Sequence, residues 1–344
     1  MLLSDYDYIL PPAQIAQEPV AIRDQSKLMV LDRRRETADH ASFADLPGRL
    51  EPGDLLVLND TRVFPARIEG RKATGGRMDF LLVRERPRPG VWEALCEGVR
   101  ELRPGMTLRF GEASAEVLGR SGESIVLAFP AECDVRSLLA RCGSVPLPPY
   151  IRRAASDRRS PGDAERYQTI YARQAGSVAA PTAGLHFTAE LMQRLGERGV
   201  RLAFLTLDVG PGTFLPIRTE DARSHRIHAE RFRLPEATAA AIRDAKRRGG
   251  RIVAVGTTTA RVLEQAAGRD HLLREDEGEC TLYVLPGHRF RCVDALITNF
   301  HLPRSTLLLF VCAFAGRDRI LVAYRRAVES GYRFYSYGDA MLIL

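Results

Sequence analysis

The sequence lacks several patterns that would place it in a broad class. Its six cysteines form no Cys-x-x-Cys pair, which argues against a zinc ribbon and against a disulfide framework. The longest apolar run, at residues 306–315, is about half of the roughly 20 residues that span a bilayer. Asp5 and Asp7 stand where a signal peptide would carry basic residues. We therefore expect a soluble, cytoplasmic protein with reduced thiols and no contact with a membrane.

Lysine is also scarce. It occurs only at Lys27, Lys72 and Lys246, although lysine and arginine together number 50. The net charge of +7 and the isoelectric point near 9.3 fit an anionic partner such as RNA. Because so strong an arginine bias can equally reflect genome base composition, the charge alone does not decide between these interpretations.

The length of 344 residues suggests about two domains. Within residues 64–147, short alternating apolar runs are separated by glycine and proline, a pattern that favours a small β-barrel or sandwich. These runs lie at residues 78–84, 91–96, 106–110, 115–118 and 124–129. Elsewhere strand and helix patterns alternate, as in an α/β fold. We predict a large mixed α/β domain, formed by residues 1–63 and 148–344, with an inserted small β-barrel domain at residues 64–147.

Five polar clusters each follow the end of a predicted strand. They lie at residues 59–62 (Asn-Asp-Thr-Arg), 181–186 (Pro-Thr-Ala-Gly-Leu-His), 208–213 (Asp-Val-Gly-Pro-Gly-Thr), 256–259 (Gly-Thr-Thr-Thr) and 299–303 (Asn-Phe-His-Leu-Pro). Ligands of α/β proteins bind beyond the carboxyl ends of the strands. The clusters therefore predict one pocket assembled from distant segments, which is typical of an enzyme.

His186 precedes Thr188, the expected N-cap of a helix, by two residues. The partial positive charge of a helix N-terminus disfavours imidazolium, so His186 would be neutral, as a base or a hydrogen-bond donor must be. The alternative is that His186 completes the hydrogen bonds of a turn. Asn299 and His301 follow another strand, and Pro303 then imposes an extended turn.

Residues 228–234 alternate between polar and apolar types, so His228 and Glu230 would share one face of a strand. Together with His225 they could ligate a metal and serve a metal-dependent hydrolase. The H-E-x-x-H order is absent, however, and no cysteine is near, so we favour a hydrogen-bonding site and expect no metal.

Other polar segments also have two interpretations. Asp60 and Arg62 could hold a polar ligand or form an ion pair within the fold, and the turn at residues 256–258 could bind an anion. That turn lacks the glycine fingerprints of nucleoside triphosphate and NAD sites. The basic segment at residues 151–173 is either a loop that contacts phosphates or a solvated loop. For residues 332–337, we favour a terminal strand docked in the core over a surface that stacks on bases.

Taken together, these motifs closely resemble the S-adenosylmethionine:tRNA ribosyltransferase-isomerases of the queuosine pathway. The matching segments span the chain and lie at residues 6–11, 15–19, 59–67, 176–188, 225–230, 255–258, 298–303 and 337–341. Each segment alone would be weak evidence for this family, whereas the combination of all of them is highly specific for it. One departure is Asp208, where the family usually has a histidine, which puts the role of that segment in doubt.

The resemblance implies a monomer without a prosthetic group. It also implies that the ribosyl part of S-adenosylmethionine is transferred to a 7-aminomethyl-7-deazaguanine in the tRNA anticodon. Isomerisation then gives epoxyqueuosine, and adenine and methionine are released. A non-catalytic RNA-binding protein is the other alternative, but it would leave the polar strand ends unexplained.

This reaction assigns roles to the candidate residues. A sulfonium acidifies the ribose C5′ protons, so a general base can remove one. We expect His186 or His301 to be that base, His228 and Glu230 to bind ribose or adenine, and Asp60 and Arg62 to order the methionyl end. The other residues expected to bind the donor are Thr182, Gly256, Thr257, Thr258 and Asn299. Those expected to contact tRNA are Arg152, Arg153 and Arg158.

Overall fold

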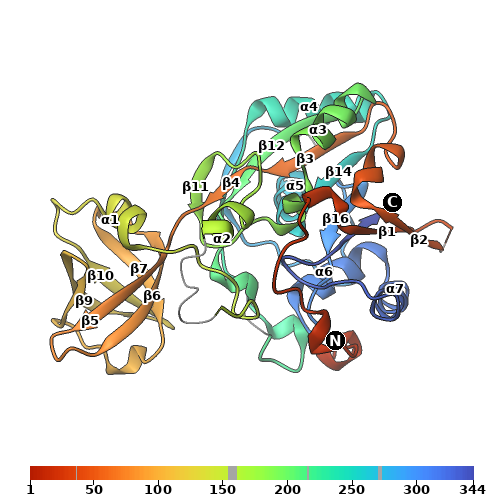
Figure 1. The fold of residues 1–344 in the computed structure, drawn as a ribbon. Coiled ribbons are helices and arrows are strands. Elements are labelled where there is room, and N and C mark those ends of the chain that lie inside the picture. Colours follow the sequence, from red (N-terminus) through yellow and green to blue (C-terminus); the bar gives the residue numbers. More distant parts are fainter. Residues whose placement is uncertain (36, 154–160, 215–216, 270–272) are drawn as a thin grey trace.

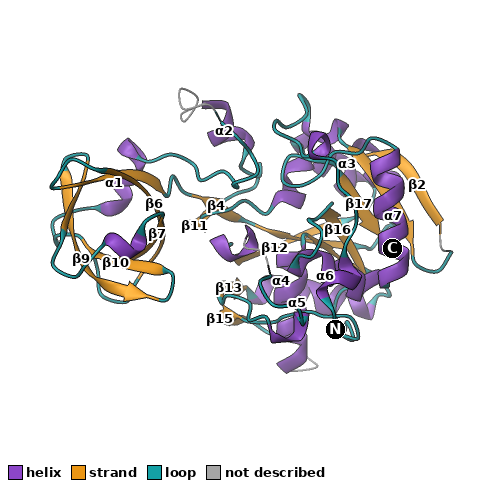
Figure 2. Cartoon of the chain, turned by 90° about the horizontal axis from the view of Figure 1, so that it is seen from below, coloured by secondary structure: helices purple, strands orange, loops and turns teal. Residues whose placement is uncertain are grey.

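The structure is a computed structural model that describes residues 1–35, 37–153, 161–214, 217–269 and 273–344. It consists of a large α/β body and a small β-barrel set to one side of it (Figure 1). Figure 2 shows the barrel as a ring of strands joined to the body by extended segments. The predicted class, a mixed α/β fold with a small β-barrel, is confirmed.

Within the described residues, nine strands form one mixed sheet in the order β15-β13-β12-β3-β14-β16-β17-β1-β2. In chain order they are β1 (Lys27–Asp32), β2 (Thr37–Ser42), β3 (Leu55–Asn59), β12 (Arg201–Leu207), β13 (Glu230–Leu234), β14 (Ile252–Val255), β15 (Asp276–Cys280), β16 (Ala295–Asn299) and β17 (Ala340–Ile343). The central strands β12, β3, β14 and β16 are parallel. Their carboxyl ends therefore meet at one edge of the sheet.

The sheet is covered on both faces, which explains why its central strands are continuously apolar. In β3, Leu55 and Val57 belong to the core on one face, whereas Leu56 and Leu58 belong to the core on the other. The first face is covered by α4 (Glu236–Arg247), α5 (Thr257–Arg269), α6 (Thr306–Ala315) and α7 (Arg317–Glu329). The second is covered by α3 (Ala189–Glu197) and the 3₁₀-helix η4 (Phe43–Gly48), and Figure 2 shows α3 across the sheet from α4 and α5.

The barrel closes in the order β10-β7-β6-β5-β8-β9. Its strands are β5 (Arg67–Lys72), β6 (Arg77–Glu85), β7 (Val91–Cys96), β8 (Thr107–Phe110), β9 (Ala113–Ser121) and β10 (Ser124–Ala128), and α1 (Val135–Cys142) packs beside them. Gly70 allows the barrel to close tightly, because a Cβ there would lie 2.6 Å from Phe80 and 2.7 Å from Phe110. These strands fall inside the predicted insertion of residues 64–147, whose boundaries stay a prediction.

Short elements connect the two parts. β4 (Thr61–Val63) leads into the barrel and pairs in parallel with β11 (Gln174–Ser177), which follows α2 (Pro161–Arg166) on the return path. The predicted helix cap at Thr188 is present, since its side chain accepts a hydrogen bond from the Leu191 N–H. Ser305 caps α6 in the same way by accepting one from the Leu308 N–H.

Two expectations about strands are wrong. Residues 332–337 do not form a strand; they form a loop, and the terminal strand is β17, which begins at Ala340. β13 begins at Glu230, so His228 precedes the strand and is exposed. In the part of the chain that the structure describes, no helix combines the length and the hydrophobicity of a membrane span.

Candidate active site

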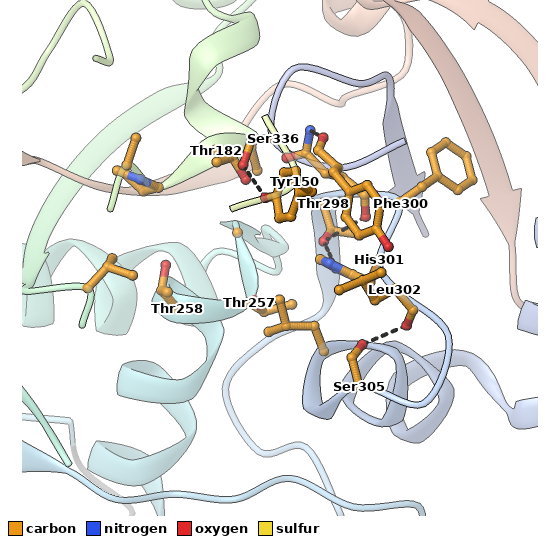
Figure 3. Close-up of a pocket in the computed structure, with 18 residues that line it drawn as sticks. Tyr150, Thr182, Thr257, Thr258, Thr298, Phe300, His301, Leu302, Ser305 and Ser336 are labelled. Atoms are coloured by element: carbon orange, nitrogen blue, oxygen red, sulfur yellow. Dashed lines mark hydrogen bonds between the residues drawn. The ribbon is translucent and has the colours of Figure 1, made fainter. Parts of the chain in front are cut away.

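A cavity lies beyond the carboxyl edge of the parallel strands (Figure 3). We call it the sheet-edge cavity. Its walls come from the loops after β12, β14 and β16, from η7 (Thr182–His186) and from the loop before β17. The lining residues are Tyr150, Ala180, Pro181, Thr182, Ala183, Val209, Gly256, Thr257, Thr258, Thr298, Asn299, Phe300, His301, Leu302, Ser305, Leu307, Tyr335 and Ser336. Four of the five predicted polar clusters thus contribute to one cavity.

The lining of the sheet-edge cavity is mostly apolar, with hydroxyl, amide and imidazole groups among it, and it carries no formal charge. Among the described residues that line it, none is aspartate, glutamate, lysine or arginine. Tyr150 and Tyr335 stack with ring centroids 4.5 Å apart, and the Tyr150 hydroxyl lies 2.6 Å from Ser336 Oγ (Figure 3). At Gly256, φ is +90°, and this turn directs β14 into the first turn of α5. Such walls suit a neutral, planar ligand with hydrogen-bonding edges.

His301 lines the cavity and is held at both its side chain and its backbone. Its Nε2 lies 2.7 Å from Thr298 Oγ1 (Figure 3), and its backbone N–H donates to the Tyr324 hydroxyl oxygen at 3.1 Å. The Tyr8 hydroxyl donates to the His301 carbonyl oxygen. Burial lowers the pKa of His301 to about 3, so the imidazole is neutral at physiological pH.

His186 lies behind the cavity wall rather than on it. Its Nε2 is 3.2 Å from Asn299 Nδ2, its Nδ1 is 2.7 Å from Ser26 Oγ, and its ring packs against Phe43 at 4.9 Å. Burial, with smaller contributions from Arg333 and Arg23, lowers the pKa of His186 to about 3. The predicted neutral state therefore results mainly from burial, and Asn299 separates this imidazole from the cavity.

A second cavity, which we call the ion-pair cavity, contains His225, His228 and Glu230 together with Arg261 and Tyr283. Glu230 and Arg261 are only 6% and 7% exposed and form an ion pair. The other Glu230 carboxylate oxygen accepts the Gly210 N–H at 2.9 Å. Both oxygens of Glu230 are thus already engaged. Among the described residues, no group of three or more His, Cys, Asp or Glu is arranged to hold a metal.

A third and larger space, about 900 Å³ in volume, separates the barrel from the body. We call it the barrel cleft. Trp92 and Arg136 line it from the barrel side, and Asp208 and Arg231 line it from the body. The carboxylate of Asp208 accepts a hydrogen bond from Thr61 Oγ1 at 3.1 Å, and burial raises the pKa of Asp208. Asp208, which stands where the family usually has a histidine, therefore lies at the barrel cleft.

The three spaces adjoin one another. Val209 lines both the sheet-edge cavity and the barrel cleft. Leu307 lines both the sheet-edge cavity and the ion-pair cavity, and Glu230 lines both the ion-pair cavity and the barrel cleft. An uncharged pocket, a charged pocket and an open cleft thus meet around a few shared residues.

The structure does not bring Asp60 and Arg62 to the sheet-edge cavity. Asp60 accepts a hydrogen bond from Thr206 Oγ1 at 2.7 Å and is 8% exposed, whereas the side chain of Arg62 is exposed on β4. The neighbouring Asn59 amide bridges β3 to both the N–H and the carbonyl of Leu207. This polar cluster therefore joins two strands by hydrogen bonds, and the partner of Asp60 is a threonine hydroxyl rather than the guanidinium that the ion-pair alternative expected.

Of the three arginines expected to contact tRNA, Arg152 is exposed. Two nitrogens of the Arg153 guanidinium donate to Asp163 at 2.7 Å, and its side chain is 17% exposed. Arg158 lies outside the described residues. Of the two arginines that the structure describes, Arg152 thus has the exposure that an ionic contact with a phosphate needs, whereas Arg153 is mostly buried and paired.

Sequence reasoning did not assign Tyr150, Tyr335 and Ser336 to the site. For Tyr335 and Ser336 the available signal was the aromatic segment at residues 332–337, which was expected to form a terminal strand docked in the core. Tyr335 adopts φ = +72°, an uncommon backbone conformation for a residue other than glycine. Such strain often occurs at ligand-binding sites, but it cannot be recognised from the sequence.

The two buried histidines lead us to expect a loss of stability on acidification. Both have a pKa of about 3 in the folded protein and about 6.5 when unfolded. Between these values the unfolded state binds more protons, so the free energy of unfolding falls as the pH is lowered below about 6.5. Urea titrations from about pH 7 to about pH 5 should show this slope. His186→Gln and His301→Gln should each reduce it, by up to about 1.4 kcal/mol per pH unit; unchanged slopes in both variants would contradict the assignment.

Known proteins resemble the chain over its whole length. Residues 3–343 match the family described as queuosine biosynthesis protein. The S-adenosylmethionine:tRNA ribosyltransferase-isomerase of Anaeromyxobacter dehalogenans is 52% identical, covering 100% of this chain and 99% of the relative. The enzyme of that name from Pelobacter propionicus is 51% identical, with 100% of both chains covered. A crystal structure titled S-adenosylmethionine tRNA ribosyltransferase, from Thermotoga maritima, is 39% identical with a TM-score of 0.58, covering 99% of this chain and 100% of that one. The chain therefore belongs to the queuosine biosynthesis family of S-adenosylmethionine:tRNA ribosyltransferase-isomerases.

Proposed function

We propose that this protein is a cytoplasmic, monomeric enzyme that uses S-adenosylmethionine as a ribosyl donor. The acceptor is tRNA that carries 7-aminomethyl-7-deazaguanine at the wobble position. The aminomethyl nitrogen gains the ribosyl group, which isomerises to an epoxycyclopentanediol, while adenine and methionine leave. The names of the relatives, at about half identity over the full length, support this assignment.

The main support for the proposal is that three cavities with different linings adjoin one another. The uncharged sheet-edge cavity, with its stacked tyrosines, suits the adenosine half of the donor. The adjoining ion-pair cavity offers the exposed imidazole of His228, beside the Glu230–Arg261 pair, to the zwitterionic methionyl half. The barrel cleft, with a volume of about 900 Å³, has room for a nucleotide of the acceptor. The reacting carbon would then lie near Val209 and Leu307, which the spaces share.

The base that removes a ribose C5′ proton is His301 in this proposal. Among the described histidines, it is the one that lines the sheet-edge cavity. Its Nε2 is occupied by Thr298, so Nδ1 is the nitrogen left for the substrate. Burial keeps the imidazole unprotonated, and the neighbouring sulfonium makes the C5′ proton more acidic. The acidified C5′ proton favours transfer to the ring, whereas burial ensures only that the ring is free to accept the proton, because a lowered pKa also makes the imidazole a weaker base.

The activity itself can be tested by the release of adenine. We expect the purified protein to release adenine from S-adenosylmethionine only when the tRNA carries the 7-aminomethyl-7-deazaguanine precursor, and to do so equally well in the presence of a chelator. Chromatography of the products measures both. Release that stopped with the chelator would favour the metal-dependent alternative, and tRNA binding without any release would favour the non-catalytic one.

We expect His301→Gln to lower kcat by roughly 10²- to 10⁴-fold, the usual contribution of a positioned general base. His40→Gln is the matched control, because His40 is an exposed histidine on β2, away from the cavities. Single-turnover adenine release at saturating donor isolates the chemical step. A His301 variant with wild-type kcat would rule out this residue as the base.

The exposure of Arg152 leads to an expectation about tRNA binding. Arg152→Glu should weaken binding and reduce the slope of log affinity against log salt by about 1, because one phosphate contact is lost. Arg153→Glu should change that slope less, since Asp163 already occupies the guanidinium. Arg325→Glu, on the exposed face of α7, makes the same change in net charge and serves as the control. Equal slopes for the Arg152 variant and the wild type would remove this segment from the interface.

A further inference from the structure

The orientation of the Asn299 side chain is determined by its neighbours. One amide atom lies 3.1 Å from the Tyr335 carbonyl oxygen and 3.2 Å from His186 Nε2. A carbonyl oxygen can only accept, so this atom must be the amide nitrogen. The amide oxygen is buried, and it has no hydrogen-bond partner among the described residues. Asn299 thus brings an unused acceptor to the wall of the sheet-edge cavity.

His186 and Ser26 hold this amide in place. Because His186 Nε2 accepts a hydrogen bond from the Asn299 amide, the neutral ring carries its proton on Nδ1, and this N–H donates to Ser26 Oγ at 2.7 Å. Ser26 is 1% exposed and His186 is 4% exposed. Phe43 packs against the imidazole ring. The chain from Ser26 through His186 therefore fixes Asn299 without either residue reaching the cavity.

Tyr335 brings a second unused group to the same wall. Its hydroxyl is buried and has no hydrogen-bond partner in the described part of the chain. Its ring is held by stacking on Tyr150, and its backbone carbonyl oxygen accepts a hydrogen bond from the Asn299 amide. The phenol stays protonated because burial raises its pKa. The cavity wall thus combines an acceptor with a hydroxyl that can donate, on two residues that hold each other.

Buried polar groups are rarely left without partners, so a ligand is expected to supply them. Adenine presents an exocyclic amine, which donates, next to a ring nitrogen, which accepts. We propose that the Asn299 amide oxygen accepts the adenine amine and that the Tyr335 hydroxyl donates to the adjacent ring nitrogen. His186 and Ser26 are positioning residues in this arrangement. The inference rests on the proposed function, since it identifies the part of the donor that the sheet-edge cavity recognises.

The same pair contributes to the departure of adenine. When the glycosidic bond breaks, its electron pair moves onto the purine ring. A hydroxyl that donates to a ring nitrogen stabilises that negative charge. Tyr335 is then a catalytic residue as well as a recognition residue, whereas His186 affects the reaction only through Asn299.

Binding of two donors that differ at one group tests the proposal. S-inosyl-L-methionine carries a carbonyl oxygen where S-adenosylmethionine carries the amine, so it would face the Asn299 oxygen with a second acceptor. By titration calorimetry on the full-length protein, we expect the wild type to prefer S-adenosylmethionine by roughly tenfold or more. Asn299→Ala and Tyr335→Phe should each reduce this ratio of dissociation constants. Tyr332→Phe removes a buried hydroxyl that bonds His40 outside the cavity, and it should leave the ratio unchanged.

The positioning role of Ser26 can be measured separately, by donor preference and by the kinetic constants of its variants. Ser26→Ala should reduce the same ratio and raise KM for S-adenosylmethionine more than it lowers kcat, whereas Ser26→Thr, which keeps the hydroxyl, should restore both. A merely structural serine would change the melting temperature and not the preference between donors.

A wild type that binds both donors equally and still releases adenine would overturn the adenine pocket alone. Failure to bind either donor, with no adenine released from precursor-bearing tRNA, would overturn the proposed function as well.

Discussion

The site depends on one constraint, the burial of the central parallel strands on both faces. Because β3, β14 and β16 are sandwiched between helices, their side chains are committed to the two cores. Polar chemistry can then appear only where the strands end. Parallel pairing brings those ends to one edge, so segments about 40 residues apart in the chain, such as Gly256 and Asn299, face the same cavity. The geometry of the fold, rather than any local motif, assembles the site.

The same burial determines which groups are charged. Both histidines near the cavity are held neutral mainly because burial removes most of the solvation that an imidazolium would need. The charges lie elsewhere, in the Glu230–Arg261 pair and along the barrel cleft. A donor whose purine is neutral and whose amino acid is zwitterionic would meet two environments that match its two halves. This separation keeps the desolvation cost of charged groups away from the uncharged pocket.

Much of the fold could be predicted from the sequence, because its strongest signals are local. The alternation of strand and helix patterns indicated the α/β body, and Thr188 marked a helix start by a capping chemistry that does not depend on the rest of the chain. β5 was not recognised, since it carries Gly70 where an inward apolar side chain would be expected. That glycine is required by Phe80 and Phe110, which are distant in the sequence.

The site was predictable to a lesser extent, for a similar reason. Thr182, Gly256, Thr257, Thr258, Asn299 and His301 could be placed together because strand ends converge, and the structure lines one cavity with them. Whether a polar side chain faces a cavity or joins two strands depends on tertiary contacts. Asp60 and His186 have the same kind of sequence signal as His301, but each is turned to partners on neighbouring segments.

The position of His186 shows why a conspicuous histidine need not perform the chemistry. Proton transfer needs a ring that reaches the substrate, and the Asn299 amide stands between His186 and the cavity. What a rigid, neutral imidazole can do from that position is select one of the two orientations of an amide. An amide that could rotate would present nitrogen or oxygen to a ligand with little preference. Locked by His186 and by the Tyr335 carbonyl, it presents only oxygen. A buried hydrogen-bond chain can thereby contribute to specificity without contacting the ligand.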